Sequence, residues 1–150
     1  MDKNIAVVGC GYWGKNLVRN FAELGSLHTI CDSSPEALSQ FETLYPDIGR
    51  ETSFERVLSN KEIRGVVISS PAALHYSMAK QALLAGKDVF VEKPLSLAVK
   101  EGEELIGIAE KNSKFLMVRH VLEYHPEIVR CGMKFSNWGT AHSNETFEFE

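Results

Sequence analysis

Three glycines that follow a short apolar run near the start of the chain constrain its fold most. The run, residues 5–8, is typical of a buried strand, and Gly9, Gly11 and Gly14 follow it. In a strand–turn–helix unit that binds a dinucleotide, the first glycine permits the tight turn. The second lets the backbone approach a pyrophosphate, and the third lets the helix pack closely on the strand. The N–H groups and the dipole at the start of that helix favour an anion.

A lone acidic residue supplies a second signal, which is needed because glycines at this spacing also occur in ordinary loops. Asp32 ends the next apolar run, residues 27–31. A carboxylate there can accept hydrogen bonds from both hydroxyls of an adenosine ribose, and its charge would repel a 2′-phosphate. No arginine follows Asp32 directly. The pattern therefore predicts NAD rather than NADP, and the alternative is a solvated acid at a strand end.

Length and composition exclude several classes of protein. The 150 residues, 44% of them hydrophobic, are enough for one well-packed core. The formal charge of −4 leaves no basic surplus, so we expect no nucleic-acid partner. No apolar stretch approaches the roughly 18 residues of a membrane span, and a signal peptide is not evident, which predicts a cytoplasmic protein without membrane contact. Cys10, Cys31 and Cys131 lack metal-ligand spacing, so we expect reduced thiols and no metal site.

Strand-like runs alternate with helix-period segments up to about residue 118. This alternation predicts an α/β fold, a doubly wound parallel sheet of the Rossmann type. Strands are expected at residues 5–8, 27–31, near 51–52, and at 65–68, 88–91 and 115–118. Ser34, Ser70 and Ser96 are expected to cap three of the helices, the first two with a proline in the first turn. Helical periodicity places Leu24, Leu44 and Leu74 on buried faces.

The carboxyl ends of parallel strands are where ligands bind in such sheets. Lys93 directly follows the apolar strand 88–91, so it is the catalytic candidate. A partly buried lysine beside a nicotinamide is suited to take or return the proton of an alcohol during hydride transfer. The alternative is a surface charge. The residues expected to bind the cofactor are Gly9, Gly11, Tyr12, Trp13, Gly14, Asp32, Ser69, Ser70, Pro71, His75, Glu92, Lys93 and Pro94.

Three segments together resemble one oxidoreductase family over the chain up to about residue 126. They are the glycine segment VVGCGYWG, residues 66–75 (VVISSPAALH) and residues 85–94 (AGKDVFVEKP). The sequence is similar to the N-terminal half of the glucose-fructose oxidoreductase, inositol dehydrogenase and rhizopine-catabolism family. Residues 11–24 resemble members from bacterial surface-polysaccharide synthesis, which act on nucleotide-linked amino sugars and sugar acids.

The resemblance implies roles for several residues. Lys93 falls on the active-site lysine, Pro94 on a proline often preceded by a cis bond, and Glu92 on the acid that helps to position the lysine. Pro71 and His75 fall on the loop that passes the nicotinamide ribose, so His75 is expected to be a cofactor-side or structural histidine. Trp13 is expected either to border the nicotinamide pocket or to pack in the fold.

The resemblance also implies a second domain that supplies most of the sugar contacts. We expect residues 1–126 to be the dinucleotide-binding domain. Residues 127–150 would be a connecting helix and the truncated start of the substrate domain, a first strand that is disordered, refolded or paired with another copy. The catalytic histidine partner is not assigned, because His120 and His125 lie on the wrong motif. Glu123 stands where relatives usually carry an arginine.

Two functions remain open from the sequence. The first is an NAD-dependent oxidoreductase domain that transfers hydride between the nicotinamide and a sugar or nucleotide-sugar hydroxyl, and that is inactive without the missing domain. The second is a non-enzymatic NAD-binding module, a remnant or a sensor. Turnover that is lost on Lys93→Ala would separate the two.

Overall fold

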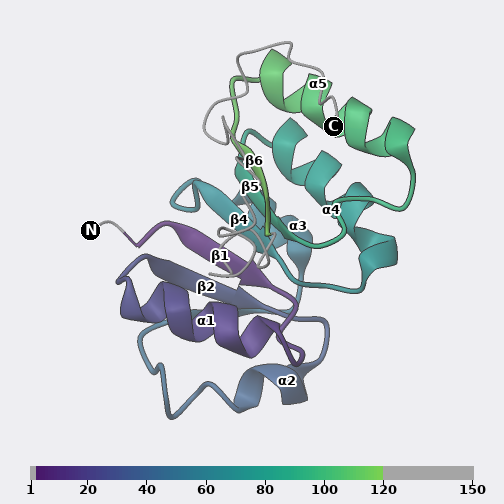
Figure 1. Ribbon diagram of the computed structural model, residues 1–150. Helices are drawn as coiled ribbons and strands as arrows, with labels where there is room; N and C mark the ends of the chain where they lie inside the picture. The colour runs from purple at the N-terminus through teal and green to yellow at the C-terminus, as the bar shows by residue number, and fades with distance from the viewer. Residues whose placement is uncertain (1–2, 120–150) are drawn as a thin grey trace, which may run out of the picture. The chain divides into compact units, whose positions relative to one another are not determined.

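Strands and helices alternate along the chain in the computed structural model, which describes residues 3–119 (Figure 1). The predicted domain boundary at residue 126 and the predicted C-terminal strand lie outside these residues. The strands are β1 (Ile5–Val8), β2 (Leu27–Cys31), β3 (Gly49–Glu51), β4 (Gly65–Ile68), β5 (Asp88–Glu92) and β6 (Leu116–Arg119). The helices are α1 (Gly14–Glu23), α2 (Pro35–Ser39), α3 (Phe54–Ser59), α4 (Ala72–Leu84) and α5 (Val99–Lys111).

All six described strands are parallel and form one sheet in the order β3-β2-β1-β4-β5-β6. The strand order reverses between β1 and β4, which makes the carboxyl ends of these two strands the topological switch point. Open α/β sheets bind their ligands at this position. The predicted doubly wound α/β fold is therefore confirmed.

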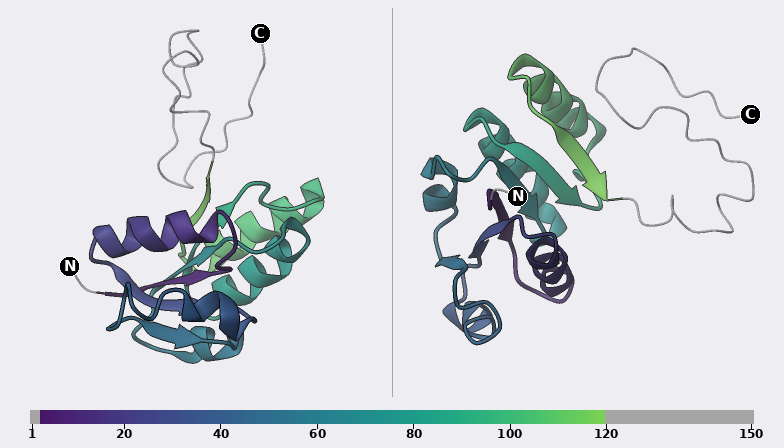
Figure 2. Two further views of the ribbon diagram at one scale, coloured as in Figure 1. Left: turned by 90° about the horizontal axis from the view of Figure 1, so that it is seen from below. Right: turned by 90° about the vertical axis from the view of Figure 1, so that its left-hand side faces the viewer.

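Helices cover both faces of the sheet, and a separate apolar core lies under each layer. Val7 and Val67 point to the face covered by α1 and α2, whereas their neighbours Val8 and Ile68 point to the face that carries α4 and α5. This follows from the period of two in a strand, which sends successive side chains to opposite faces. Figures 1 and 2 show α1 on one side of the sheet and α4 with α5 on the other.

Two of the three predicted serine caps are wrong. Ser34 caps α2 as expected, because its Oγ accepts a hydrogen bond from the backbone N–H of Ala37 at 3.2 Å. By contrast, α4 begins one residue later than predicted, with Pro71 in the capping position, and Ser70 caps nothing. The helix α5 begins at Val99, and Ser96 instead donates to the carbonyl of Ala98 at 2.9 Å.

Three leucines that helical periodicity placed inside are exposed. Leu24 is 59% exposed because α1 ends before it, and Leu44 is 69% exposed because α2 ends at Ser39. Leu74 is 47% exposed, since the buried position in the first turn of α4 belongs to His75. The errors therefore concern where helices end and which residue in a turn faces the sheet.

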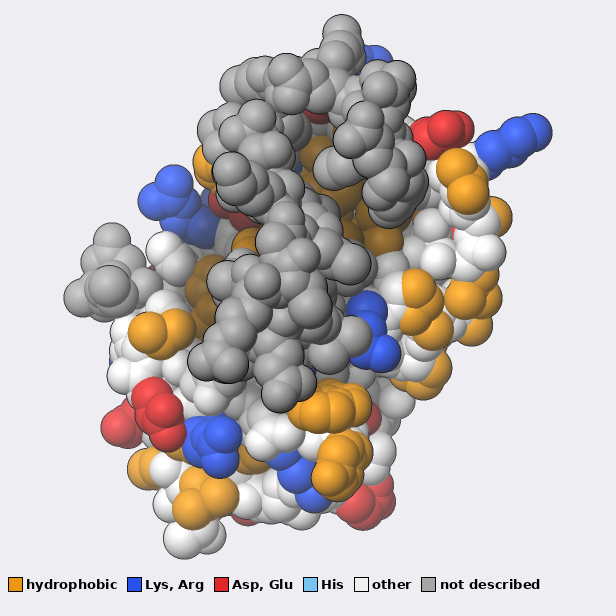
Figure 3. Space-filling view, in the orientation of Figure 1, with side chains coloured by type: hydrophobic (Ala, Val, Ile, Leu, Met, Phe, Trp, Pro, Cys, Tyr) orange, Lys and Arg blue, Asp and Glu red, His pale blue; other side chains and the backbone are white. Residues whose placement is uncertain are grey.

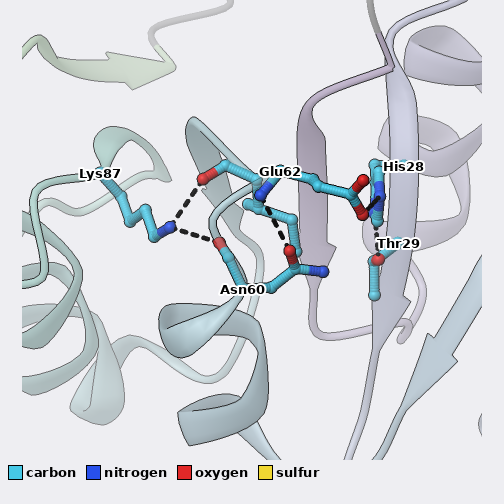
Figure 4. Close-up of polar contacts among 6 residues, drawn as sticks. His28, Thr29, Asn60, Glu62 and Lys87 are labelled. Atoms are coloured by element: carbon cyan, nitrogen blue, oxygen red, sulfur yellow. Dashed lines mark hydrogen bonds and ion pairs between the residues drawn. The ribbon is translucent and has the colours of Figure 1, made fainter.

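A buried lysine connects two loops at the amino ends of the strands, opposite the expected site. The Lys87 ammonium donates to the carbonyls of Asn60 and Ile63 at 2.6 and 2.7 Å, and the residue is 6% exposed (Figure 4). Burial, with the charge of Lys114, lowers the pKa of Lys87. The two carbonyls satisfy the buried donor, so Lys87 is explained by packing rather than by chemistry.

The visible surface over α4 and α5 carries separate hydrophobic side chains with charged ones among them (Figure 3). The exposed leucines, valine and isoleucine of this region are Leu74, Leu84, Leu97, Val99 and Ile106. Within the described part of the chain, none of the helices is long and apolar enough to cross a membrane.

Candidate functional site

The loop between β1 and α1 depends on two of its three glycines for steric reasons. Gly9 has a φ of +90°, and a Cβ there would lie 2.7 Å from the backbone of Ser69. A Cβ on Gly14 would lie 1.9 Å from the carbonyl oxygen of Gly9. Gly11 differs, because a Cβ on it would meet nothing within 4 Å. The backbone at Gly11 thus faces open space, as the approach of a pyrophosphate requires.

Free backbone donors line this open space. The N–H groups of Gly11, Tyr12 and Trp13 make no hydrogen bond to any other residue in the described range 3–119. They precede α1, whose first turn contains no acidic side chain. The helix dipole adds partial positive charge at the same place, so the loop can bind an anionic group such as a pyrophosphate.

The carboxylate of Asp32 is held in place by the backbone on both sides. One oxygen, Oδ2, accepts from the N–H of Cys10 at 2.7 Å, and Oδ1 accepts from the N–H of Ser34 at 2.9 Å. A carboxylate has about four lone-pair sites, so each oxygen can accept a further hydrogen bond. Asp32 is half-buried beside the glycine loop, where its remaining lone pairs can accept from a ligand hydroxyl.

The end of β4 lies against the glycine loop. Ser69 donates its N–H to the carbonyl of Val8 at 2.8 Å, which places β4 and β1 side by side where both end. The hydroxyl of Ser70 is buried and has no partner among the described residues. Pro71, which follows, is exposed. The backbone of Ser69 and Ser70 therefore lies directly against Gly9.

His75 joins the end of β4 to the end of β5. Its Nδ1 lies 2.6 Å from the carbonyl oxygen of Pro94, and its Nε2 lies 2.7 Å from that of Ser70. The side chain is 2% exposed. Because both ring nitrogens contact backbone carbonyls, His75 fixes the segment after Lys93 against the loop after β4.

Lys93 follows β5 at the carboxyl edge of the sheet, but it is exposed rather than partly buried as expected. The strand ends at Glu92, so the lysine side chain leaves the packed sheet. The peptide bond between Lys93 and Pro94 is cis, as the resemblance implied. Glu92 forms its ion pair with Arg119, at 2.6 Å, rather than with Lys93. Its expected role in positioning the lysine stays a prediction.

Two thiols lie beneath the glycine loop and Asp32. Burial, with the nearby charge of Asp32, raises the pKa of Cys10 to about 12 and that of Cys31 to about 12. Such thiols are protonated at neutral pH and unreactive. In residues 3–119, no group of three or more His, Cys, Asp and Glu side chains is arranged to hold a metal ion.

Arg119 is the residue of this edge whose contacts the sequence did not predict. Arg119, the last residue of β6, pairs with Glu92, and its guanidinium lies 5.3 Å from the ring centroid of Trp13. Its position at a strand end indicated that Arg119 lies at the carboxyl edge of the sheet. The sequence did not predict its two partners, because contacts between distant strand ends depend on the order of the strands.

The family is decided by a match to a sequence model that covers residues 3–120. This model describes an oxidoreductase family with an NAD-binding Rossmann fold. The chain belongs to the GFO/IDH/MocA oxidoreductase family. Membership in the GFO/IDH/MocA family confirms both the resemblance and the predicted cofactor, NAD.

Individual GFO/IDH/MocA relatives show how far the likeness extends. A glycosyl hydrolase family 109 protein of Shewanella amazonensis is 29% identical over 128 residues, which are 78% of this chain and 28% of that protein. The structure of GenD2 from gentamicin A biosynthesis, in complex with NAD, is 28% identical with a TM-score of 0.79. The match covers 37% of GenD2 and 85% of this chain. The WlbA dehydrogenase of Bordetella pertussis, in complex with NADH and UDP-GlcNAcA, is 25% identical with a TM-score of 0.79, over 87% of this chain and 41% of WlbA.

The chain spans between 28% and 41% of the length of these three proteins. The matched part is the one that contains the glycine loop, Asp32 and Lys93.

Proposed function

We propose that this chain provides the NAD-binding part of an oxidoreductase that acts on a hydroxyl of a sugar or nucleotide sugar. The observation that carries the proposal is the arrangement at the switch point. N–H groups of the glycine loop that have no partner among residues 3–119 lie at a strand end adjacent to that of Asp32, whose carboxylate two backbone N–H groups hold. One can bind a pyrophosphate and the other the adenosine ribose, which is how Rossmann folds bind NAD.

The site residues have separate roles in this proposal. Gly9, Gly11 and Gly14 shape the loop, while the backbone of Tyr12 and Trp13 binds phosphate. Ser69, Ser70 and Pro71 border the ribose on the nicotinamide side, and His75 and Pro94 fix the backbone around Lys93. NAD held by these residues would supply the hydride acceptor for the carbon that carries the hydroxyl. Lys93 takes the proton of that hydroxyl, or returns it in the reverse direction.

The nucleotide-sugar substrate class is supported by the relatives. WlbA was crystallised with a UDP-linked sugar acid, and its fold over this region is the same. We infer that residues outside the described part bind most of the sugar, and that residues 127–150 begin the substrate domain. We also propose the cytoplasm as the location, because an NAD-dependent oxidoreductase works where its cofactor is abundant.

An NAD-binding module without activity is the second candidate. The exposure of Lys93 favours it, because catalytic lysines are usually desolvated. Turnover of a sugar by this protein, lost in Lys93→Met with NAD binding retained, would exclude the second candidate. NAD binding without turnover of any sugar, in a form of the protein that includes the substrate domain, would favour it.

The place of Lys93 beside the nicotinamide is tested by comparing NAD⁺ with NADH. The nicotinamide ring is cationic in NAD⁺ and neutral in NADH, so a nearby ammonium weakens the binding of NAD⁺ alone. Removing about 1 kcal/mol of repulsion should raise the affinity for NAD⁺ about fivefold in Lys93→Met and leave that for NADH nearly unchanged. Lys100→Met, at an exposed position of α5, is the control. Equal changes for both cofactors in Lys93→Met would place the lysine away from the nicotinamide.

A further inference from the structure

Trp13 and Arg119 meet across the carboxyl edge of the sheet, although their elements are far apart in it. Trp13 precedes α1 in the loop after β1, and Arg119 ends β6. The strands β4 and β5 lie between β1 and β6. With neighbouring strands about 4.8 Å apart, β1 and β6 lie about 14 Å apart. The contact between the two side chains, at 5.3 Å from guanidinium carbon to ring centroid, therefore crosses the ends of β4 and β5.

The arginine in this contact is held by a second partner. Its Nη1 lies 2.6 Å from Oε1 of Glu92, its register partner on β5. The side chains of Arg119 and Glu92 are only 25% and 12% exposed. A planar guanidinium can pair with a carboxylate and stack on an aromatic ring at the same time. Glu92 thus fixes Arg119, and Arg119 fixes one side of the indole.

The indole itself is not held by the core. Trp13 remains 54% exposed. Besides Arg119 it contacts the ring of Tyr12 edge-on, and Tyr12 is itself 84% exposed. An exposed tryptophan without such a contact would sample several rotamers. The Arg119–Glu92 pair is therefore the feature of the described structure that orients the ring.

The strand order tells which part of a dinucleotide would meet this ring. Asp32 follows β2, on one side of the glycine loop, and is placed to bind the adenosine ribose. The pyrophosphate would bind at the loop, so the nicotinamide half must extend in the other direction, over the ends of β4 and β5. Trp13 and Arg119 cross the sheet at that position.

We propose that Arg119, held by Glu92, is a positioning residue that orients Trp13 as a wall of the nicotinamide pocket. The inference rests on the proposed NAD-binding function and adds a residue to it. Ordering a free side chain on binding costs roughly 0.5–1.5 kcal/mol, which corresponds to about two- to tenfold in affinity. Arg119 removes this cost for the nicotinamide half alone, because in this arrangement the adenosine half contacts the side chain of neither residue.

The test compares NADH with ADP-ribose, which lacks the nicotinamide. Titrations by calorimetry use the full chain and the variant Arg119→Met, which keeps an unbranched side chain but removes the guanidinium and its charge. We expect Arg119→Met to bind NADH about two- to tenfold more weakly and ADP-ribose with unchanged affinity. Arg19→Met is the control, because Arg19 is exposed on α1 and pairs with Glu23 on the same helix. Equal loss for both ligands, or no loss for NADH, would overturn the inference.

A second pair of variants shows whether Arg119 acts through the indole. In a Trp13→Ala background, the additional change Arg119→Met should alter NADH binding less than twofold, because no ring remains to be oriented. A full effect in that background would overturn the proposed route. If Arg119→Met does not fold, Arg119→Lys replaces it, since a lysine keeps the charge but cannot stack and pair in the same way.

Fluorescence supplies a readout that a general loss of stability would not move. The chain has two tryptophans, so Trp138→Phe leaves Trp13 as the only emitter. In that background, we expect Arg119→Met to lower the emission anisotropy of Trp13 without ligand and to reduce energy transfer from Trp13 to bound NADH. Unchanged anisotropy would overturn the inference.

Failure of the proposed function is distinguishable from failure of this inference. If the parent protein binds neither NADH nor ADP-ribose, the proposed function fails and this inference fails with it. If the parent and Arg119→Met bind NADH equally well, only this inference fails.

Discussion

The two buried thiols beneath Asp32 make the protein sensitive to alkaline pH. Their pKa values are raised from 9.0 to about 12 in the folded state, chiefly by burial. The unfolded chain therefore releases these protons first as the pH rises above 9. The stability that the neutral thiols provide is fully present below pH 9 and is lost between there and about pH 12.

We predict that the variant Cys10→Ala, Cys31→Ala loses less stability than the parent as the pH rises from 9 to about 11, although cavities make it less stable at neutral pH. Each thiol accounts for up to about 1.4 kcal/mol per pH unit in this window. Urea unfolding at a series of pH values measures the difference. Parallel pH profiles for parent and variant would show that the thiols do not ionise differently on unfolding.

Single side chains also mark the limit of what the sequence could predict. The sequence predicted that Asp32 and Lys93 lie at the carboxyl ends of strands. It did not predict the hydrogen-bond partners of Asp32, because these are backbone N–H groups that the fold brings near it. The exposure of Lys93 was mispredicted, since an apolar strand says nothing about how the chain leaves the sheet.

Among the glycines of residues 3–119, Gly14 in the turn before α1 would bring an added Cβ nearest to another atom. A methyl group on Gly14 would lie 1.9 Å from the carbonyl oxygen of Gly9, which belongs to backbone and cannot move aside cheaply. We predict that Gly14→Ala destabilises the protein by about 1–3 kcal/mol and weakens NAD binding, because the loop must shift.

The matched control is Gly107→Ala in the interior of α5. A Cβ at Gly107 would meet nothing within 4 Å, so alanine should stabilise the protein by about 0.5–1 kcal/mol through helix propensity. Urea unfolding of both variants measures the two effects. We expect the free energy of unfolding to fall in Gly14→Ala and to rise in Gly107→Ala. Similar changes in both variants would contradict the close approach of Gly14 to Gly9.

Helix boundaries were predicted less well than the helices themselves. Periodicity extended α2 to Leu44, whereas the structure ends it at Ser39. Serine followed by proline predicted the start of α2 correctly and that of α4 one residue early. A side chain can cap only where the backbone leaves its oxygen facing the first turn, and this geometry is set by packing against the sheet.

The sheet as a unit was predictable because several independent patterns agree on it. Apolar runs alternate with helical segments, and the glycine turn sets the first crossover. Parallel strands then place the ends of β1, β2, β4 and β5 at one edge, which brings Asp32 beside the glycine loop. The contact between Trp13 and Arg119 could not be predicted from the sequence. It depends on the order of the strands and on two side chains that approach each other from opposite sides of β4 and β5.

Binding of NAD by the whole domain is the claim on which the other proposals depend. Calorimetric titration with NAD tests it directly. We predict a saturable heat for one site, with weaker binding of NADP because the carboxylate of Asp32 repels a 2′-phosphate. Absence of heat at NAD concentrations up to about millimolar, while circular dichroism shows the protein folded, would contradict the account.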